Sequence, residues 1–224
     1  TGYPKDEIED IWQSLGYKDN LVDAGELFHL WVIEGPQELA KRLPFDQVGL
    51  DVIWTDDQTP YRTRKVRILN GAHTSCIPIS YLYGLDTVLE MMDDPKMGKY
   101  VEQIVYDEII PSMDYPADMM KSFADSVLDR FRNPYIKHYL LSILLNSTSK
   151  FKSRVLPSLI QYQEKKGSLP EKICLSLACL LWVYREGTVE GNILHGKRAK
   201  GDFDMQDDAF ALDILHSAWM NHGN

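Results

Sequence analysis

The sequence predicts a mainly α-helical protein with a small β element near its N-terminus. Two runs rich in β-branched and aromatic residues, LFHLWVIEG (27–35) and VGLDVIWTDD (48–57), predict strands. After Tyr61 the apolar spacing becomes helical and stays so. Prolines stand where four of the later helices should begin: Pro95, Pro116, Pro134 and Pro170. With 224 residues, 44% of them hydrophobic, we expect one mostly helical domain over residues 1–224.

The individual elements follow in chain order. PKDEIEDIWQSLG predicts a short helix, with Pro4 in its first turn and Gly16 at its end. A second short helix near 36–43 separates the two strands. The first long helix, YRTRKVRILNGAHTSCI (61–77), should bend or end at Pro78 and lie at one edge of the domain. Strands are expected only before Tyr61, and the remaining helices near 85–92, 95–110, 116–130, 134–146, 151–165, 169–185 and 206–221.

Composition narrows the function classes. A formal net charge of -9 argues against nucleic-acid binding, which needs a basic face. The longest apolar run, ICLSLACLLWVY (173–184), is shorter than the roughly 20 residues that span a membrane. Three cysteines, Cys76, Cys174 and Cys179, without a secretory signal indicate reduced thiols in a cytoplasmic protein. We therefore expect neither a nucleic acid nor a membrane as partner.

The stretch KVRILNGAH (65–73) carries the chemistry. At about 100° per residue on an α-helix, Lys65, Asn70 and His73 project at about 0°, 140° and 80°, which places them on one broad face. A lysine can take the hydroxyl proton of a secondary alcohol, if burial or positive charge such as Arg64 or Arg67 favours its neutral form. An asparagine amide can donate to the developing oxyanion, and a histidine can hold substrate hydroxyls. A solvated face with a satisfied histidine gives the same pattern, so spacing alone leaves both interpretations open.

The motif resembles the K-x4-N-x2-H signature of the polyol-specific long-chain dehydrogenases, the mannitol dehydrogenase family. Other segments agree in order and rough spacing: WVIEGP (31–36), DDQTPYRTRKVRILNGAHT (56–74), RFRNPYIKH (130–138) and STSKF (147–151). The resemblance covers essentially the whole chain. It implies a multi-helical C-terminal substrate domain of the kind seen in 6-phosphogluconate dehydrogenase.

The resemblance also implies residue roles. Lys65 becomes the general acid and base, Asn70 steadies the oxyanion, and His73 binds the reacting or adjacent hydroxyl. Lys150 matches a family lysine that contacts the substrate. Many polyol-specific members carry an arginine eight residues before that lysine, where this chain has Ser142.

Other groups must then make the substrate contacts that this arginine makes in those members. The candidates are Asn133, His138 and Asn146, whose alternative role is local capping or loop hydrogen bonding. A carboxylate-bearing substrate needs a cationic clamp, and Lys150 with the arginines near the motif could provide one. A neutral polyol substrate stays open.

The implied activity is an NAD-dependent interconversion of tagaturonate and altronate, with NADP, fructuronate or mannitol as alternatives. Family members bind the nicotinamide cofactor on an N-terminal Rossmann domain, and no G-x-G-x-x-G occurs in this sequence. We therefore expect a partner Rossmann domain in the same protein, no cofactor site in this chain, and no activity of the chain alone. A non-catalytic helical association module is the alternative from another class.

Three further patterns predict no function. GNILHGKR (191–198) approaches a phosphate loop, but Arg198 replaces the required Ser or Thr, so we expect an exposed loop. Acid pairs such as Asp207-Asp208 lack partners at ligand spacing, so no metal site is expected. Cys174 and Cys179, five residues apart on an apolar helix, are expected in the core.

Overall fold

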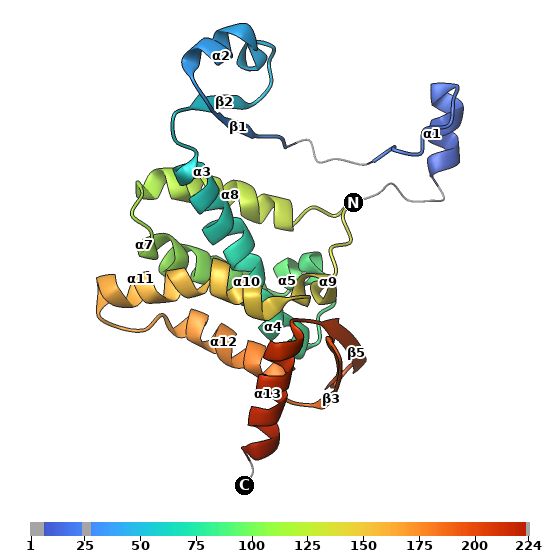
Figure 1. Cartoon of the computed structure of the whole chain (residues 1–224), viewed down its shortest axis with the longest axis vertical. Helices are drawn as coiled ribbons and strands as arrows, with labels where there is room; N and C mark the ends of the chain where they lie inside the picture. Colours follow the sequence, from blue (N-terminus) through green and yellow to red (C-terminus); the bar gives the residue numbers. More distant parts are fainter. Residues whose placement is uncertain (1–6, 24–27, 223–224) are drawn as a thin grey trace. The chain divides into compact units, whose positions relative to one another are not determined.

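The computed structural model describes residues 7–23 and 28–222. Two compact units make up the chain, Thr1–Gln58 and Thr59–Asn224, and each is considered by itself. Helices dominate and a small sheet lies near the N-terminus, so the predicted fold class is confirmed (Figure 1). No helix within the described ranges combines the length and the apolar character that a membrane crossing needs.

In the first unit, β1 (Trp31–Glu34) and β2 (Val52–Thr55) pair in parallel. Parallel neighbours need a crossover connection, and α2 (Gln37–Arg42) lies in it. Both predicted strands and the short helix between them are confirmed. The predicted N-terminal helix is α1 (Ile8–Leu15), closed by a left-handed glycine, while the Pro4 of that prediction lies outside the described residues.

The second unit begins with one continuous helical rod. Its three parts are α3 (Thr59–Arg64), the π-helical turn η2 (Lys65–Asn70) and α4 (Gly71–Tyr83). The other helices of this unit are α5 (Val88–Asp93), α6 (Pro95–Gln103), the π-helical η3 (Ile104–Ile109), α7 (Ile110–Ser112), α8 (Ala117–Phe131), α9 (Leu140–Leu144), α10 (Ser147–Arg154), α11 (Leu156–Lys166), α12 (Glu171–Val183) and α13 (Ala209–Asn221).

The rod lies at the centre of this unit. α4 is buried along most of its length and packs against α9, α10 and α12 (Figure 1). The expected position at an edge of the domain is therefore wrong. Pro78 lies inside α4 and does not end it. Proline removes a backbone hydrogen bond there, but its neighbours Ile77 and Tyr81 are almost completely buried, and this packing outweighs the loss.

Strands also occur after Tyr61, so the prediction that confined them to the N-terminal region is wrong. β3 (Gly187–Glu190), β4 (Ile193–Arg198) and β5 (Gly201–Gln206) form an antiparallel meander, with β4 in the middle. The segment expected as an exposed loop is thus a central strand. Its Gly196 looks like a strand breaker, yet a Cβ there would lie 2.4 Å from the ring of Phe203. Glycine makes room for that ring.

Two predicted helices differ from the structure in a way that matters for the site. Of the segment 134–146, which was expected to be one helix, only α9 is helical. The residues before α9 are held extended, because Val88 N–H donates to His138 O (2.9 Å) and Leu140 N–H donates to Asp86 O (2.9 Å). The helix expected over 151–165 is two helices, α10 and α11, which meet at Val155. Pro157 in the first turn of α11 explains the break.

Candidate active site

The predicted motif lies on the π-helical turn and the start of α4. In a π turn the backbone bonds from residue i to i+5, and such turns occur often at functional sites. The wider turn brings Asn70 closer to the face of Lys65 than the 140° of a regular α-helix. Lys65 is exposed, Asn70 half-buried and His73 buried, so the three side chains step from the surface inward.

His73 is the most unusual of the three. Its ring packs against Phe131 (centroids 4.0 Å apart) and meets the ring of His138 edge-on at 5.3 Å. Burial is the largest cause that lowers the pKa of His73 to about 3, and the electrostatic effects of the nearby His138, Arg154 and Arg130 contribute to the same shift. The ring is thus neutral at any working pH. Its Nε2 is buried without a hydrogen-bond partner, which is rare for a buried polar atom and leaves this nitrogen able to bond an incoming polar group.

The backbone explains why His138 lies there. The extended pairing of Thr87 with Tyr139 fixes residues 138–140 beside the start of α5. His138 itself is exposed. The structure therefore brings His138 next to the motif, as expected for a residue that helps to bind the substrate.

Lys150 lies on α10, which packs against both η2 and α4. Its Nζ donates to the carbonyl of Ile143 at 2.9 Å. Burial lowers the pKa of Lys150, the nearby Arg154 lowers it further, and Asp207 partly offsets both. A half-buried ammonium beside the motif is consistent with the predicted substrate contact.

The other candidates are less well supported by their surroundings. The side-chain oxygen of Asn133 accepts from the backbone N–H of Tyr135 at 3.0 Å, which is the alternative loop role. Asn146 precedes α10 in a left-handed conformation (φ 56°), which asparagine tolerates well. Ser142 is exposed on α9.

The arginines of the motif do not form the expected clamp. Arg67 is buried, and its guanidinium donates to Ser158 (2.6 Å) and Ser112 (3.0 Å), which joins the rod to α11 and α7. Arg64 lies over the rings of Tyr61 and Phe123, 4.9 and 4.7 Å from their centroids. The guanidinium of Arg67 is therefore committed to contacts within the protein.

Sequence reasoning missed two other arginines. Arg154 and Arg130 both act electrostatically on His73. Arg154 follows Lys150 by four residues, the spacing that puts two side chains on one helix face, and this signal was available in the sequence. Arg130 directly precedes Phe131, but only the fold reveals that Phe131 covers His73.

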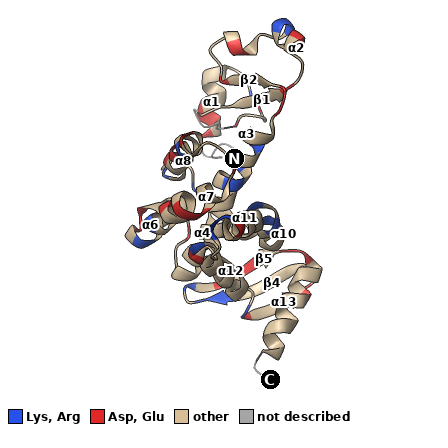
Figure 2. Ribbon diagram, turned by 90° about the vertical axis from the view of Figure 1, so that its left-hand side faces the viewer, with Lys and Arg blue, Asp and Glu red and all other residues tan. Residues whose placement is uncertain are grey.

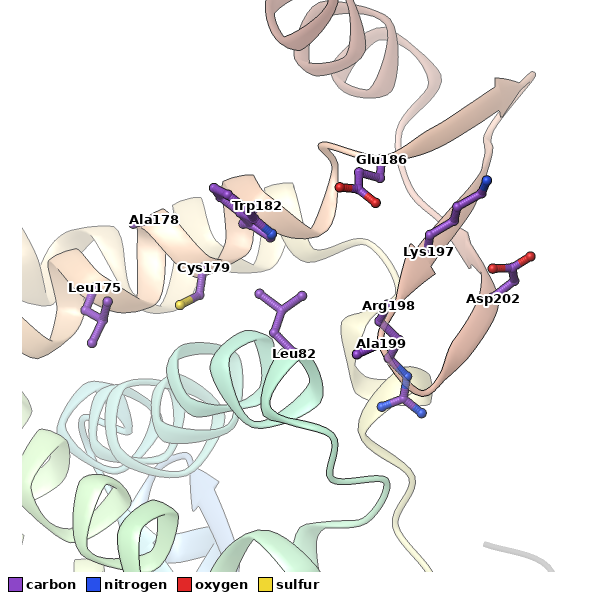
Figure 3. A pocket seen from close by; sticks show the side chains of 10 residues that line it. All are labelled: Leu82, Leu175, Ala178, Cys179, Trp182, Glu186, Lys197, Arg198, Ala199 and Asp202. Carbon is purple, nitrogen blue, oxygen red and sulfur yellow. The ribbon is translucent and has the colours of Figure 1, made fainter.

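A pocket of about 790 Å³ lies elsewhere in this unit (Figure 3). It is formed by the C-terminal end of α4, α12 and the β4–β5 hairpin, with Leu82, Trp182 and Arg198 among its lining residues. Leu82 follows His73 by nine residues, about 13 Å along a helix axis. None of the predicted site residues lines this pocket, so it is separate from the candidate site.

Within the described residues, no cluster of three His, Cys, Asp or Glu side chains could hold a metal ion. The acid pair at 207–208 has structural roles instead. Asp207 is buried and accepts from the backbone N–H (3.1 Å) and hydroxyl (2.6 Å) of Thr148 and from the hydroxyl of Tyr184 (2.5 Å). Asp208 caps α13 by accepting from Ala211 N–H. Asp207 thus fixes the first turn of the helix that carries Lys150.

Asp207→Asn is expected to destabilise the protein by about 2 kcal/mol, because one acceptor oxygen of the carboxylate becomes an amide donor facing other donors. Denaturant unfolding measures the change. The exposed Asp213→Asn on α13 is the control, with an expected effect below about 0.5 kcal/mol. Equal stability of the two variants would contradict the role given to Asp207.

His73→Gln is expected to make stability less sensitive to acid. Because the pKa of His73 is about 3 when folded and 6.5 in a free side chain, the unfolded state binds more protons between these values. The stability from this neutral ring is complete above about pH 6.5 and decreases as pH falls, by about 1 to 2 kcal/mol from pH 7 to 5. Unfolding curves at both pH values should show this loss in the wild type and in the exposed control His222→Gln, but not in His73→Gln. An unchanged acid dependence in His73→Gln would refute the assignment.

The helical fold, with the Lys65, Asn70 and His73 motif on its central rod, is the class of multi-helical domain that the resemblance of the motif implied. The chain belongs to the mannitol dehydrogenase C-terminal domain family, whose model matches residues 57–200. The resemblance inferred from the motif is therefore confirmed.

The chain is 46% identical to an altronate oxidoreductase of Yersinia pestis bv. Antiqua (strain Nepal516) over 226 residues, which cover 100% of this chain and 45% of that protein. It is also 46% identical to an altronate oxidoreductase of Escherichia coli O139:H28 over 222 residues, 99% of this chain and 44% of that one. This chain therefore spans less than half the length of these relatives.

Two solved structures share the fold. One is mannitol 2-dehydrogenase of Pseudomonas fluorescens in a ternary complex with NAD and D-mannitol, with a TM-score of 0.74 and 21% identity over 98% of this chain and 42% of that one. The other is a substrate-free D-sorbitol dehydrogenase, with a TM-score of 0.68 and 22% identity over 93% of this chain and 40% of that one.

Proposed function

We propose that this chain is the substrate-binding part of an NAD-dependent oxidoreductase that interconverts altronate and tagaturonate. The family membership and the identity to altronate oxidoreductases support it. Three segments, LNGAHT (69–74), GLDTV (84–88) and EIIPSMDYP (108–116), resemble tagaturonate reductase, another name for that activity. The observation that carries the proposal is the buried neutral His73, with an unpartnered Nε2, on the same rod as Lys65 and Asn70.

In the oxidation direction, the neutral amine of Lys65 accepts the proton of the reacting hydroxyl. The C–H bond of the same carbon breaks with its electron pair, and a C=O bond forms. Asn70 donates through its amide to the oxygen as negative charge develops there, which lowers the barrier because the donor is already in place. In reduction, Lys65 returns the proton to the new alcohol oxygen.

His73 orients the substrate. A neutral imidazole offers one N–H donor and one acceptor, so it can bond a hydroxyl in either sense. A substrate hydroxyl that displaces the exposed His138 from beside the ring would give Nε2 the partner it lacks. The low pKa of His73 keeps the ring from competing with Lys65 for the proton.

The hydride acceptor, when bound, is the nicotinamide ring of NAD. The sequence has no glycine-rich loop to hold its phosphates, and the arginines next to the motif are committed to protein contacts. We therefore assign the dinucleotide to a Rossmann domain in the part of the relatives that this chain does not span.

Turnover by the full-length protein tests the proposal. NADH oxidation is measured with tagaturonate, fructuronate and fructose, and NADPH replaces NADH in a parallel series. We expect the highest kcat/KM with tagaturonate and NADH. A preference for fructuronate or fructose would assign the alternative substrates.

The absence of turnover with all three substrates would favour the second candidate, a helical association module. Exposed apolar side chains on α12 and α13 are the observation in its favour: Trp182 is 49%, Phe210 74% and Met220 66% exposed. Such a module has no need for an unpartnered buried imidazole.

A further inference from the structure

α10 is a locally basic helix in an acidic protein. Its sequence, STSKFKSR, contains three cations and no carboxylate, and the blue segments of Figure 2 show them gathered there. Lys150 and Arg154 are four residues apart and share one face, where like charges repel. Both are half-buried, and burial lowers the pKa of each. An anion that joins two partly desolvated cations on one face relieves their repulsion.

The part of the chain that the structure describes does not supply that anion. Lys150 Nζ bonds a carbonyl oxygen, and no carboxylate of those residues lies within ion-pair distance of Arg154. Other arginines differ: Arg198 pairs with Asp86 at 2.5 Å and Arg132 with Glu102 at 2.8 Å. Asp207 acts on Lys150 from a distance, but its oxygens are taken by Thr148 and Tyr184.

The backbone places this face against the motif. A Cβ on Gly71 would lie only 3.2 Å from the carbonyl oxygen of Arg154, so glycine permits the close approach of α10 to the rod. Gly71 directly follows Asn70 and lies two residues before His73. Arg154 is thus held beside the reacting end of the site, and its charge acts on His73.

We propose that Arg154, together with Lys150, binds the carboxylate of the substrate and makes the site select sugar acids over neutral polyols. This inference rests on the proposed function and adds a specificity-determining residue to it. A planar guanidinium binds a carboxylate through two parallel N–H···O bonds. A substrate hydroxyl cannot accept both of these bonds, and a lysine in place of the arginine cannot donate them in this geometry. A neutral polyol leaves both cations without a counter-ion, and the site therefore discriminates against it.

Calorimetric binding to the full-length protein tests this, with altronate and its neutral counterpart altritol as probes. We expect the wild type to prefer altronate. Arg154→Gln should weaken altronate binding by roughly 10- to 100-fold and collapse the altronate-to-altritol ratio. Arg154→Lys should recover part of it, because the charge returns without the bidentate geometry. Lys152→Gln removes an exposed charge from the same helix and should leave the ratio within about twofold.

Two results would overturn the inference. One is a wild type that binds altritol as well as altronate. The other is an Arg154→Gln protein that keeps the wild-type ratio. If tagaturonate is still reduced in that case, the proposed function stands and the carboxylate site is elsewhere. Thermal unfolding of each variant shows whether a loss of binding comes from misfolding. If Arg154→Gln is misfolded, the altronate-to-altritol ratio of Arg154→Lys decides whether the inference holds.

Discussion

Lys65→Ala is expected to lower kcat for altronate oxidation by about 10²- to 10⁴-fold in the full-length protein, the usual contribution of a positioned base. The fold should be unaffected, because Lys65 is exposed and surface substitutions change stability little. Lys99→Ala, at an exposed position of α6, is the matched control and should retain normal turnover. The measurement is kcat with saturating substrate and cofactor, with thermal unfolding of both variants alongside.

The pH dependence separates a base from a merely binding lysine. Alcohol oxidation releases a proton and ketone reduction takes one up, so the two rates should depend on pH in opposite senses if that proton passes through Lys65. In Lys65→Ala, the rates of oxidation and of reduction should both lose this dependence on pH. If the variant kept near-normal turnover with the same profile, the base would be another group and the mechanism above would be wrong.

The sequence predicts the helical elements well where local signals and packing agree. Thr87, three residues before Glu90, forms a capping box at the start of α5, and Gly167 closes α11 in a left-handed conformation. The failures have tertiary causes. Pro78 is accommodated because α4 is the buried spine, and Gly196 belongs to a strand because Phe203 occupies the space beside it. Neither cause is visible from neighbours in the sequence.

The candidate site also has parts that local sequence predicts and parts that depend on tertiary packing. Spacing suggested Lys65, Asn70 and His73 as site residues on one face of a regular α-helix, where the structure has a π turn. Charge near the motif suggested Arg67 as a clamp, yet Arg67 is buried against two serines. Arg154 lies far along the sequence and reaches the motif only through the approach of α10 to Gly71. A site assembled by long-range packing cannot be read from the spacing of one segment.

Asn70→Ala is expected to lower kcat roughly 10²- to 10³-fold by removing one donor to the developing oxyanion. KM for altronate should change little, because the negative charge that the amide stabilises exists only in the transition state. The pH profile should keep its shape, since Lys65 is still present to exchange the proton. This combination distinguishes Asn70 from Lys65, whose loss changes the profile.

Asn70→Asp is the sharper version of that test, since it has nearly the same shape but no donor and adds a negative charge beside the oxyanion. It should be slower than Asn70→Ala, whereas a residue that only fills space would tolerate aspartate better than alanine. The backbone carbonyl of Asn70, which accepts from the hydroxyl of Thr74 at 2.9 Å, is retained in both variants, so the helix should be preserved. Equal or faster turnover of Asn70→Asp would remove Asn70 from the oxyanion role and leave Lys65 and His73 to account for catalysis.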